Sequence, residues 1–566
     1  MKLDFNKFAG SKKFAVFFYL ILISATLASR ICAAHYLAND EPDDGKMYAQ
    51  IARNLLEQGV YSIETEAPFT PTLIRLPGYP IFLAGVYAVF GHDNNAAARI
   101  VQAVFDTATC LLVALIAWNW TEDKERKRRA ALWAFLTAAL CPFTAIYVAM
   151  ILTETLTTFL MTAMTLTATY ALKARSARAA FGWWLFAGLI AGEAVLLRPD
   201  SGLFAAGIGF TLVISGLFWQ NEPPPFKARI ATAFWRGAVF SAAFALVLVP
   251  WAIRNEQVFH LFQPLAPAHG EMPGEFVPQG FNAWVRTWID DQRFVGPTLW
   301  DLEEKPITVD QLPASAFDSD EEKERVAALL NQYNHPLQDE TKINSQANSS
   351  DLNKPEKTGQ STADSNDVEN VNGDDNNDDA EGGEADDADD QADDSSDNDN
   401  EDENNPPVKM TTEIDAGFEQ IAVERINRAP VRYYVWLPVK RAAALWFDTH
   451  SAYYPFAGEL FPLNKLDREE HQEIWLPIFV AAMWLYTLLA AAGACVLWFK
   501  RKTGLALSWL LLAALMSLPR VAFFASLENP EPRYVVELFA FASILGGIAI
   551  AQLNFKKKRD EGKQPV

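Results

Sequence analysis

Long apolar runs are the feature of this sequence that most limits its fold. A helix needs about 20 predominantly apolar residues to cross the hydrocarbon core of a bilayer. Ten runs of about that length lie at residues 14–34, 98–118, 130–150, 153–172, 182–197, 201–219, 236–253, 474–498, 503–521 and 533–553. A further run at 79–90 is too short to span, so we expect it to lie along the membrane interface or to re-enter. The sequence therefore predicts an all-α polytopic membrane protein with about ten transmembrane helices.

Acidic residues are concentrated in a single segment of this otherwise apolar chain. The net charge is −22, and residues 351–403 hold 22 Asp or Glu against two Lys, so the rest of the chain is close to neutral. A segment of this composition has too little apolar surface to offset its loss of conformational entropy, and its charges repel one another. We therefore expect an inserted, disordered acidic segment at about 340–408 that acts as a solvated linker.

The distribution of Lys and Arg predicts the orientation of the chain, because loops rich in these residues stay in the cytoplasm. Their clusters fall on one side of the membrane if residues 79–90 do not span it. These clusters are the N-terminal lysines and residues 124–129, 173–178, 227–236, 500–502 and 556–559. We expect a multi-pass protein of the cell membrane with an uncleaved first span and both termini in the cytoplasm.

This orientation divides the chain into three parts. Residues 1–253 form an N-terminal transmembrane module, whose first external loop is 35–97. Residues 254–473 form an extracytoplasmic loop domain with the acidic insert, and residues 474–566 form a C-terminal transmembrane module with a basic cytoplasmic tail. Aromatic residues are dense on both flanks of the insert, in NAWVRTWIDDQRF and RAPVRYYVWLPVKRAAALWF. We expect these flanks to be amphipathic interfacial helices that rest on the bilayer.

The segment EPDDGKMYAQIARNLLEQGVYS in the first external loop is typical of a helix. Apolar or aromatic residues recur from Tyr48 onward, and Gly59 ends the pattern. Asp43 and Asp44 precede it, and Asp is a favoured N-cap residue. Capping explains one of these two acids and leaves the other available for a functional role.

Arg75 stands just before a Pro-Gly-Tyr-Pro turn in TPTLIRLPGYPIFLAG, and Tyr79 lies within that turn. Arg and Tyr at a membrane interface are ordinary anchors. The alternative is that Arg75 is part of a clamp for a phosphate group. The sequence alone leaves both interpretations open.

Ionisable residues also lie at the external edges of the predicted spans. Glu154 opens the fourth span in MILTETLTTFL, Arg198 closes the fifth in AGEAVLLRPD, and Arg533 precedes the last in SLPRVAFFASLENPEPRYVVELF. Charges at membrane depth are costly, so they pair with one another or line a functional cavity. Arg is suited to bidentate phosphate recognition. Either a structural Glu-Arg pair or a substrate site explains any one of these residues, and together they converge on one face.

Several classes of protein are not supported by the sequence. It contains no phosphate-cradling glycine loop, nucleophile elbow, metal-binding histidine pair or nucleic-acid-binding signature. The four cysteines lie in apolar runs without metal-ligand spacing. We therefore expect no metal, no cofactor and no nucleic-acid partner, and a soluble nucleotide-sugar enzyme is unsupported.

The order of these motifs resembles the GT-C superfamily of polyprenyl-phosphate-sugar-dependent glycosyltransferases, close to the protein O-mannosyltransferase and aminoarabinose-transferase branch. The resemblance starts with Asp44 four residues before Tyr48 and continues with ARNLLEQG and RLPGYPIFLAG. It then includes TETL at the start of a span, LLRP at the end of one, and PRYVVELF before the last helix. It covers most of the membrane body.

The resemblance implies an inverting single displacement, in which a sugar moves from a polyprenyl-phosphate-linked donor to an acceptor hydroxyl on the extracytoplasmic face. It also implies that Asp44 is the general base, and no metal is required in the nearest branch. The family often has a second acid directly after the first, but Gly45 follows Asp44 here, so Asp43 remains a competitor for the role. The implied substrate-binding residues are Tyr48, Arg75, Tyr79, Glu154, Arg198 and Arg533. The acceptor, whether a glycan, a lipid or a protein, is left open.

Two other functions fit parts of the sequence. A polytopic transporter or lipid flippase also has many helices with scattered charges, but such proteins commonly show internal repeats, and none is visible here. A scaffold that binds partners through the acidic tract would leave Asp44, Arg75 and Arg533 without a purpose. The glycosyltransferase interpretation accounts for all three residues.

Overall fold

The computed structural model describes residues 12–38, 42–219, 224–267, 270–336, 408–447, 472–502 and 505–553. Helices dominate this part of the chain and no strand is found in it, so the all-α prediction is confirmed. The α-helices are α2 (Lys12–Tyr36), α3 (Asp43–Glu57), α4 (Gly78–Phe90), α5 (Asn95–Trp120), α6 (Lys124–Ala139), α7 (Pro142–Ile146), α8 (Glu154–Lys173), α9 (Ala177–Leu197), α10 (Gly202–Phe218), α11 (Phe226–Phe259), α12 (Gln279–Arg286), α13 (Asp320–Asn334), α15 (Thr412–Arg428), α16 (Leu437–Phe447), α17 (Gln472–Phe499), α18 (Ala506–Ser526) and α19 (Leu538–Ile550). Short 3-10 or π segments are η1 (Pro199–Ser201), η2 (Gln292–Phe294), η3 (Gly296–Trp300), η4 (Val309–Gln311), η5 (Ala314–Ala316), η7 (Arg432–Trp436) and η8 (Pro532–Val535).

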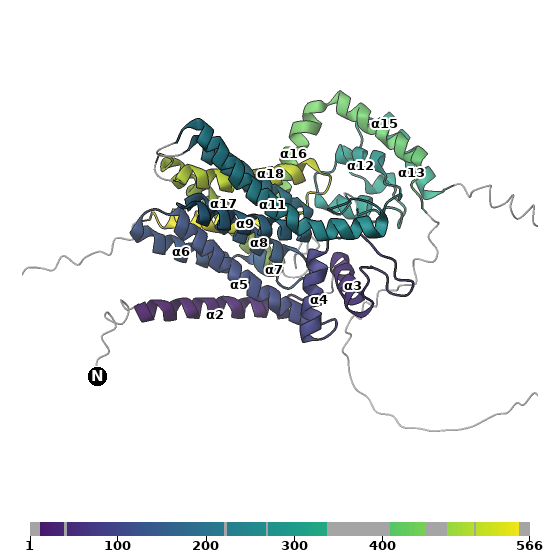
Figure 1. Cartoon of the computed structure of the whole chain (residues 1–566). Helices are drawn as coiled ribbons and strands as arrows, with labels where there is room; N and C mark the ends of the chain where they lie inside the picture. The colour runs from purple at the N-terminus through teal and green to yellow at the C-terminus, as the bar shows by residue number, and fades with distance from the viewer. Residues whose placement is uncertain are drawn as a thin grey trace, which may run out of the picture.

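Seven helical segments are long and apolar enough to cross a membrane. They are Phe17–Tyr36, Asn95–Trp120, Ala177–Leu197, Pro199–Phe218, Phe226–Phe259, Trp475–Phe499 and Ala506–Ser526. Each overlaps one of the predicted spans. The long helices pack side by side in a bundle (Figure 1), and the chain is a multi-pass membrane protein.

The other three predicted spans are helices that are shorter or more polar, so the number of ten stays a prediction. The run at 130–150 is not one continuous helix: α6 ends at Ala139, and α7 begins at Pro142, since proline is favoured at the first position of a helix. Helix α8 carries several threonines whose hydroxyls donate to carbonyls one turn earlier, as Thr158 does to Glu154 at 2.8 Å. These bonds satisfy polar side chains inside the bundle.

Helix α19 lies between α6 and α17 in the bundle, and its residues from 538 to 548 are all buried. A Cβ at Gly493 of α17 would overlap the carbonyl oxygen of Leu545, and one at Gly547 would overlap the backbone of α6. Small residues of this kind let helix backbones approach closely. The segment that carries Arg533 leads directly into α19, so its C-terminal end is held by a tightly packed helix.

A second hydrophobic core lies outside the bundle and is built by α12, α13 and α15. Phe281 and Trp284 pack their rings on Phe418 of α15, and Trp288 packs on Trp284. This differs from our expectation for the first flank of the insert, because its aromatic face is buried against another helix instead of resting on a bilayer. An amphipathic pattern alone does not distinguish these two partners. The second core lies at the same end of the bundle as α3 and α4 (Figure 1).

The acidic insert joins the second core at two neighbouring points. Helix α13 ends at Asn334, α15 begins at Thr412, and the amide of Lys409 donates to the carbonyl oxygen of Tyr333 at 3.2 Å. The predicted disorder of the insert lies outside the described residues, which stop at 336 and resume at 408. Residues on either side of the insert thus meet directly.

Candidate active site

Helix α3 forms as the sequence predicts, but its start corrects the capping interpretation. The helix spans Asp43–Glu57, and Gly59 with φ of +67° follows its end. Its N-cap is Pro42 and no side chain caps it, so neither acid is the capping residue. The side chain of Asp43 is 97% exposed and pairs with a nearby lysine. The side chain of Asp44 is only 23% exposed and faces the protein.

Two arginines hold the carboxylate of Asp44. Arg75 Nη2 donates to Asp44 Oδ1 at 3.0 Å, and Arg533 Nη2 donates to Asp44 Oδ2 at 2.8 Å. Arg75 precedes α4, and Arg533 lies in η8 just before α19, 489 residues from Asp44. Two segments of the first external loop and one segment near the last helix therefore meet at one carboxylate.

The turn after Arg75 packs closely on the end of α9. A Cβ at Gly78 would lie 2.7 Å from the carbonyl oxygen of Leu196, which is closer than real Cβ atoms approach. The hydroxyl of Tyr61 donates to the carbonyl oxygen of Arg75 at 3.2 Å. These contacts fix the backbone of Arg75 near the end of α9, where Arg198 follows.

Glu154 and Arg198 extend the ion pairs from Asp44 into the protein. Glu154 begins α8 and is 1% exposed. Arg198 Nη1 donates to Glu154 Oε1 at 2.6 Å, and Arg533 Nε lies 3.8 Å from the same oxygen. The predicted residues Asp44, Arg75, Arg533, Glu154 and Arg198 thus form one continuous network of ion pairs, which we call the bundle network.

The remaining predicted residues, Tyr48 and Tyr79, pack beside the bundle network. Their ring centroids are 5.1 Å apart in an edge-to-face arrangement. The hydroxyl of Tyr79 donates to Gln102 Oε1 of α5 at 2.8 Å. This bond holds the Tyr79 ring in the position in which Tyr48 packs on it. Burial, with the negative charge of Asp44 adding to it, raises the pKa of Tyr48 to about 12. Tyr48 is therefore a neutral hydroxyl at physiological pH.

Two opposing effects act on the pKa of Asp44. Burial raises it, but the positive charges of Arg533 and Arg75 and the hydrogen bonds that they donate lower this pKa below its ordinary value. Asp44 is therefore ionised at neutral pH. While both arginines hold it, the carboxylate is a weak proton acceptor.

Three further residues of the bundle network were not among the predicted site residues. Asp200 accepts from Arg198 at 3.2 Å, and Arg520 Nη2 contacts Asp200 at 2.6 Å and Glu537 at 3.0 Å. Asp200 lies two residues after Arg198, and Glu537 lies four residues after Arg533. The sequence could have indicated Asp200 and Glu537, because they lie close to predicted residues. It could not indicate that both pair with Arg520, because this depends on how α18 packs.

Acids and arginines alternate along the bundle network, so its carboxylates are not gathered in one place. Within the described ranges, no three His, Cys, Asp or Glu side chains are placed to hold a metal ion. The arginines are suited to a different ligand, because a guanidinium presents fixed N–H donors that match two phosphate oxygens. The arrangement at Asp44 therefore favours a phosphate-bearing ligand.

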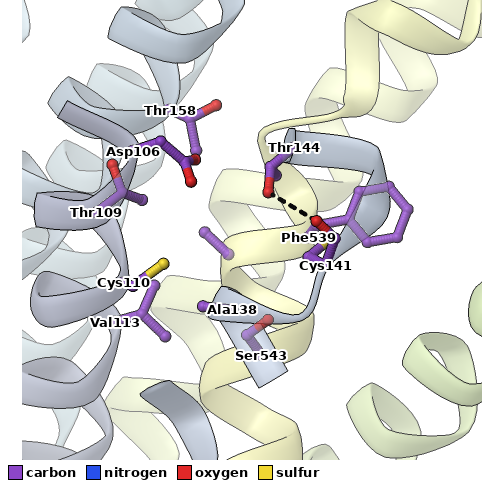
Figure 2. A pocket seen from close by; sticks show the side chains of 11 residues that line it. Asp106, Thr109, Cys110, Val113, Ala138, Cys141, Thr144, Thr158, Phe539 and Ser543 are labelled. Atoms are coloured by element: carbon purple, nitrogen blue, oxygen red, sulfur yellow. Dashed lines mark hydrogen bonds between the residues drawn. The ribbon is translucent and has the colours of Figure 1, made fainter. Parts of the chain in front are cut away.

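A small cavity lined by both polar and apolar side chains lies next to the bundle network, between α5, α6, α7, α8 and α19. Figure 2 shows Asp106, Thr109 and Thr158 on one side of it and Thr144 and Ser543 on the other. Asp106, Thr144 and Thr158 also lie in one tightly filled cluster with Glu154. Asp106 pairs at 2.6 Å with an arginine of α2, and this buried ion pair was not predicted either. Polar groups thus continue from Glu154 into the interior of the bundle.

A family model for dolichyl-phosphate-mannose-protein mannosyltransferases matches residues 71–251 of the chain. This range includes Arg75, Glu154 and Arg198 and excludes Asp44 and Arg533. For this part of the chain, the match confirms the predicted resemblance to the GT-C glycosyltransferases. No curated protein matches the chain.

Solved structures of two proteins illustrate the likeness of this chain to known folds. One is the archaeal oligosaccharyltransferase AglB from Archaeoglobus fulgidus in complex with an inhibitory peptide and a dolichol-phosphate, with 12% identity, a TM-score of 0.43, and coverage of 94% of this chain and 50% of that chain. The other is ArnT from Cupriavidus metallidurans bound to undecaprenyl phosphate, with 11% identity, a TM-score of 0.36, and coverage of 95% and 78%. The chain spans half the length of the oligosaccharyltransferase.

Proposed function

We propose that this protein is a membrane glycosyltransferase. It moves a sugar from a polyprenyl-phosphate-linked donor to an acceptor hydroxyl on the extracytoplasmic face, with inversion at the anomeric carbon. The observation that carries this proposal is the position of Asp44, hydrogen-bonded to both Arg75 and Arg533. A group that can take a proton thus lies beside two cations that can bind a phosphate, and the proposed transfer needs both.

In the proposed reaction Asp44 is the general base. The acceptor oxygen bonds to the anomeric carbon while its proton passes to the Asp44 carboxylate. The bond from the anomeric carbon to the phosphate oxygen breaks, and its electron pair leaves with the polyprenyl phosphate. A positioned base contributes about 10² to 10⁴-fold. Arg75 and Arg533 stabilise the charge on the leaving phosphate, because fixed donors aimed at developing charge lower the barrier.

The contacts of Asp44 also imply an order of events. The two arginines lower the pKa of Asp44 while they hold it. A donor phosphate that binds Arg75 and Arg533 draws these cations away from the carboxylate. The pKa of Asp44 then rises, and the carboxylate becomes able to accept a proton. Donor binding therefore prepares the base for the acceptor.

We place this site on the outer face of the cell membrane, with both termini in the cytoplasm. The Lys and Arg clusters support this orientation. Labelling of single cysteines introduced at positions 60 and 300 tests it, and labelling from the cytoplasm would contradict it. The acceptor is a glycan, a lipid or a protein. Mass spectrometry of envelope glycans and glycolipids from cells with and without the protein identifies the sugar and the acceptor together.

The experiment that tests the reaction measures sugar transfer per folded molecule for Asp44→Asn and Asp43→Asn in parallel. Asn keeps the size and most hydrogen bonds of Asp but cannot take the proton, so Asp44→Asn should lower turnover by at least about 10²-fold. Asp43→Asn is the matched control, because its exposed side chain lies outside the bundle network. Near-normal turnover in both variants would remove Asp44 as the base. A transporter or flippase predicts no sugar transfer by the unaltered protein.

A further inference from the structure

Arg520 lies at the buried end of the bundle network, and its side chain is 0% exposed. Its Nε donates to the carbonyl oxygen of Tyr534 at 2.7 Å. Its Nη2 contacts Glu537 Oε1 at 3.0 Å and Asp200 Oδ2 at 2.6 Å. Two phenylalanine rings have their centroids 4.7 and 5.1 Å from the guanidinium carbon. One side chain of α18 is thereby attached to three other segments of the chain.

These contacts connect Arg520 to Arg533 in two ways. The first is short, because Tyr534 follows Arg533 in η8, so the bond to the Tyr534 carbonyl holds the turn that presents Arg533. The second runs through side chains. Asp200 is shared by Arg520 and Arg198, Arg198 binds Glu154, and Glu154 Oε1 lies 3.8 Å from Arg533 Nε.

We propose that Arg520 is a positioning residue for the donor site, because it sets the direction of the Arg533 guanidinium. It does not touch the donor. The inference rests on the proposed function. It adds a residue at the buried end of the bundle network to those that determine phosphate binding at the exposed end. A small displacement of Arg533 would misalign it with both Asp44 and the phosphate, and misplacement of a binding group by about 1 Å can cost about 10²-fold in rate.

The geometry of Arg520 requires arginine and not only a positive charge. A guanidinium holds its donors in a rigid planar fork, whereas the ammonium of lysine is a compact charge on a flexible stem. Arg520→Lys therefore keeps the charge opposite Asp200 and Glu537 but loses the fixed directions toward Tyr534 and Asp200. This substitution separates the role of position from the role of charge.

Arg425 of α15 provides a matched control. Its side chain is also 0% exposed, it pairs with Glu322 and Asp318, and it donates to the carbonyl oxygens of two further residues. It lies in the second core, outside the bundle network. Arg425→Lys thus repeats the same chemical change at an equally buried arginine without touching the proposed donor site.

The experiment uses the full-length protein in lipid nanodiscs and measures the Kd of a polyprenyl phosphate without sugar, per folded molecule, together with the Tm. We expect Arg520→Lys to weaken binding by about tenfold or more and Arg425→Lys to leave it unchanged, although both lower the Tm. Glu537→Gln, which loosens Arg520 more gently, should weaken binding in the same direction. It decides the matter if Arg520→Lys does not fold.

The outcomes distinguish this inference from the proposed function. Unchanged binding in the folded variants of Arg520 and Glu537 would overturn the positioning role and leave the proposed function intact. Equal weakening by Arg425→Lys would also overturn it, because a general loss of stability would then explain the result. No binding of the polyprenyl phosphate by the unaltered protein would overturn the proposed function itself, and the positioning role with it.

Discussion

The bundle network and the ion pairs of the second core are built from the same residue types. They differ in how far apart in the sequence the residues that they connect lie. In the second core, Arg425, Arg428 and Arg432 all contact Asp318, and the first two also contact Glu322. These residues lie on α13, on α15, just before α13, or at the start of η7, which follows α15. The bundle network instead runs from Asp44 in α3 to Glu537, the N-cap of α19, and includes ion-paired residues 489 positions apart.

The two networks also differ in how they end. In the second core, Asp318 and Glu322 are each held by at least two arginines and are 13% and 4% exposed. In the bundle network, side-chain exposure falls from 27% at Arg75 and 23% at Asp44 to 0% at Arg520 and Glu537. One network fastens neighbouring helices, with Arg428 and Arg432 50% and 34% exposed at its surface. The other is anchored at its buried end and offers two cations to a ligand at its exposed end, so we expect substitutions in the two networks to have different consequences.

Arg425→Met should have the largest effect of all on stability and no direct effect on the reaction. It removes the buried one of the two arginines that contact Glu322, whose side chain is 4% exposed, and leaves only Arg428, which is 50% exposed. Breaking a buried ion pair from one side costs about 3 to 5 kcal/mol. Hydrogen exchange of α13 and α15 measures this loss. Lower turnover in the molecules that still fold would show that the second core also shapes the site, and the comparison would fail.

Arg533→Met should give the opposite result. Loss of a cation that stabilises the leaving phosphate lowers turnover per folded molecule by about 10²-fold, the low end for a single donor, because Arg75 remains. Arg432→Met is the control, since Arg432 pairs with Asp318 in the second core and should leave turnover unchanged. If both variants transfer sugar at the normal rate, the exposed end of the bundle network does not bind the donor.

Asp44→Asn should strengthen donor binding. This gain should be smaller than the loss of turnover expected for Arg533→Met. The neutral amide no longer competes for Arg75 and Arg533, so a polyprenyl phosphate should bind about tenfold more tightly, which corresponds to about 1.4 kcal/mol. Asp43→Asn should leave the affinity unchanged. Titration of both variants with the lipid phosphate measures the difference, and equal or weaker binding by Asp44→Asn would argue against an exchange of partners at this carboxylate.

Removal of the acidic insert should have the smallest effect. A short flexible linker from residue 345 to 408 replaces it, and the bond from Lys409 to Tyr333 already brings the flanking residues together. Expression, membrane insertion and Tm are the measurements, and all should stay unchanged. Loss of folded protein would mean that the second core depends on the insert.

The sequence predicted the exposed end of the bundle network better than its buried end. Asp44 could be found from its place at a helix start and from the family resemblance, Arg75 from the motif before its Pro-Gly-Tyr-Pro turn, and Arg533 from its place at the mouth of the last predicted span. Arg520 and Glu537 could not be assigned, because their partners depend on how α18 packs against other helices.

The apolar segments of the sequence were harder to interpret than the charged residues. The apolar face of Trp284 and Trp288 fits a bilayer surface and a helix surface equally well, and only the packing of α15 distinguishes them. The run at 130–150 is apolar throughout, but Pro142 divides it. Apolar character predicted burial in both cases, and neither the partner nor the continuity of the helix follows from it.

The meeting of Lys409 and Tyr333 makes the second core a natural attachment point. The entropy lost on closing a loop rises only with the logarithm of its length, by about 0.6 kcal/mol for each doubling. A chain of almost any length can therefore leave and return here without pulling α13 from α15. A rigid domain with adjacent termini, grafted at this point, would give a largely membrane-embedded protein a recognisable landmark for particle alignment in electron cryomicroscopy.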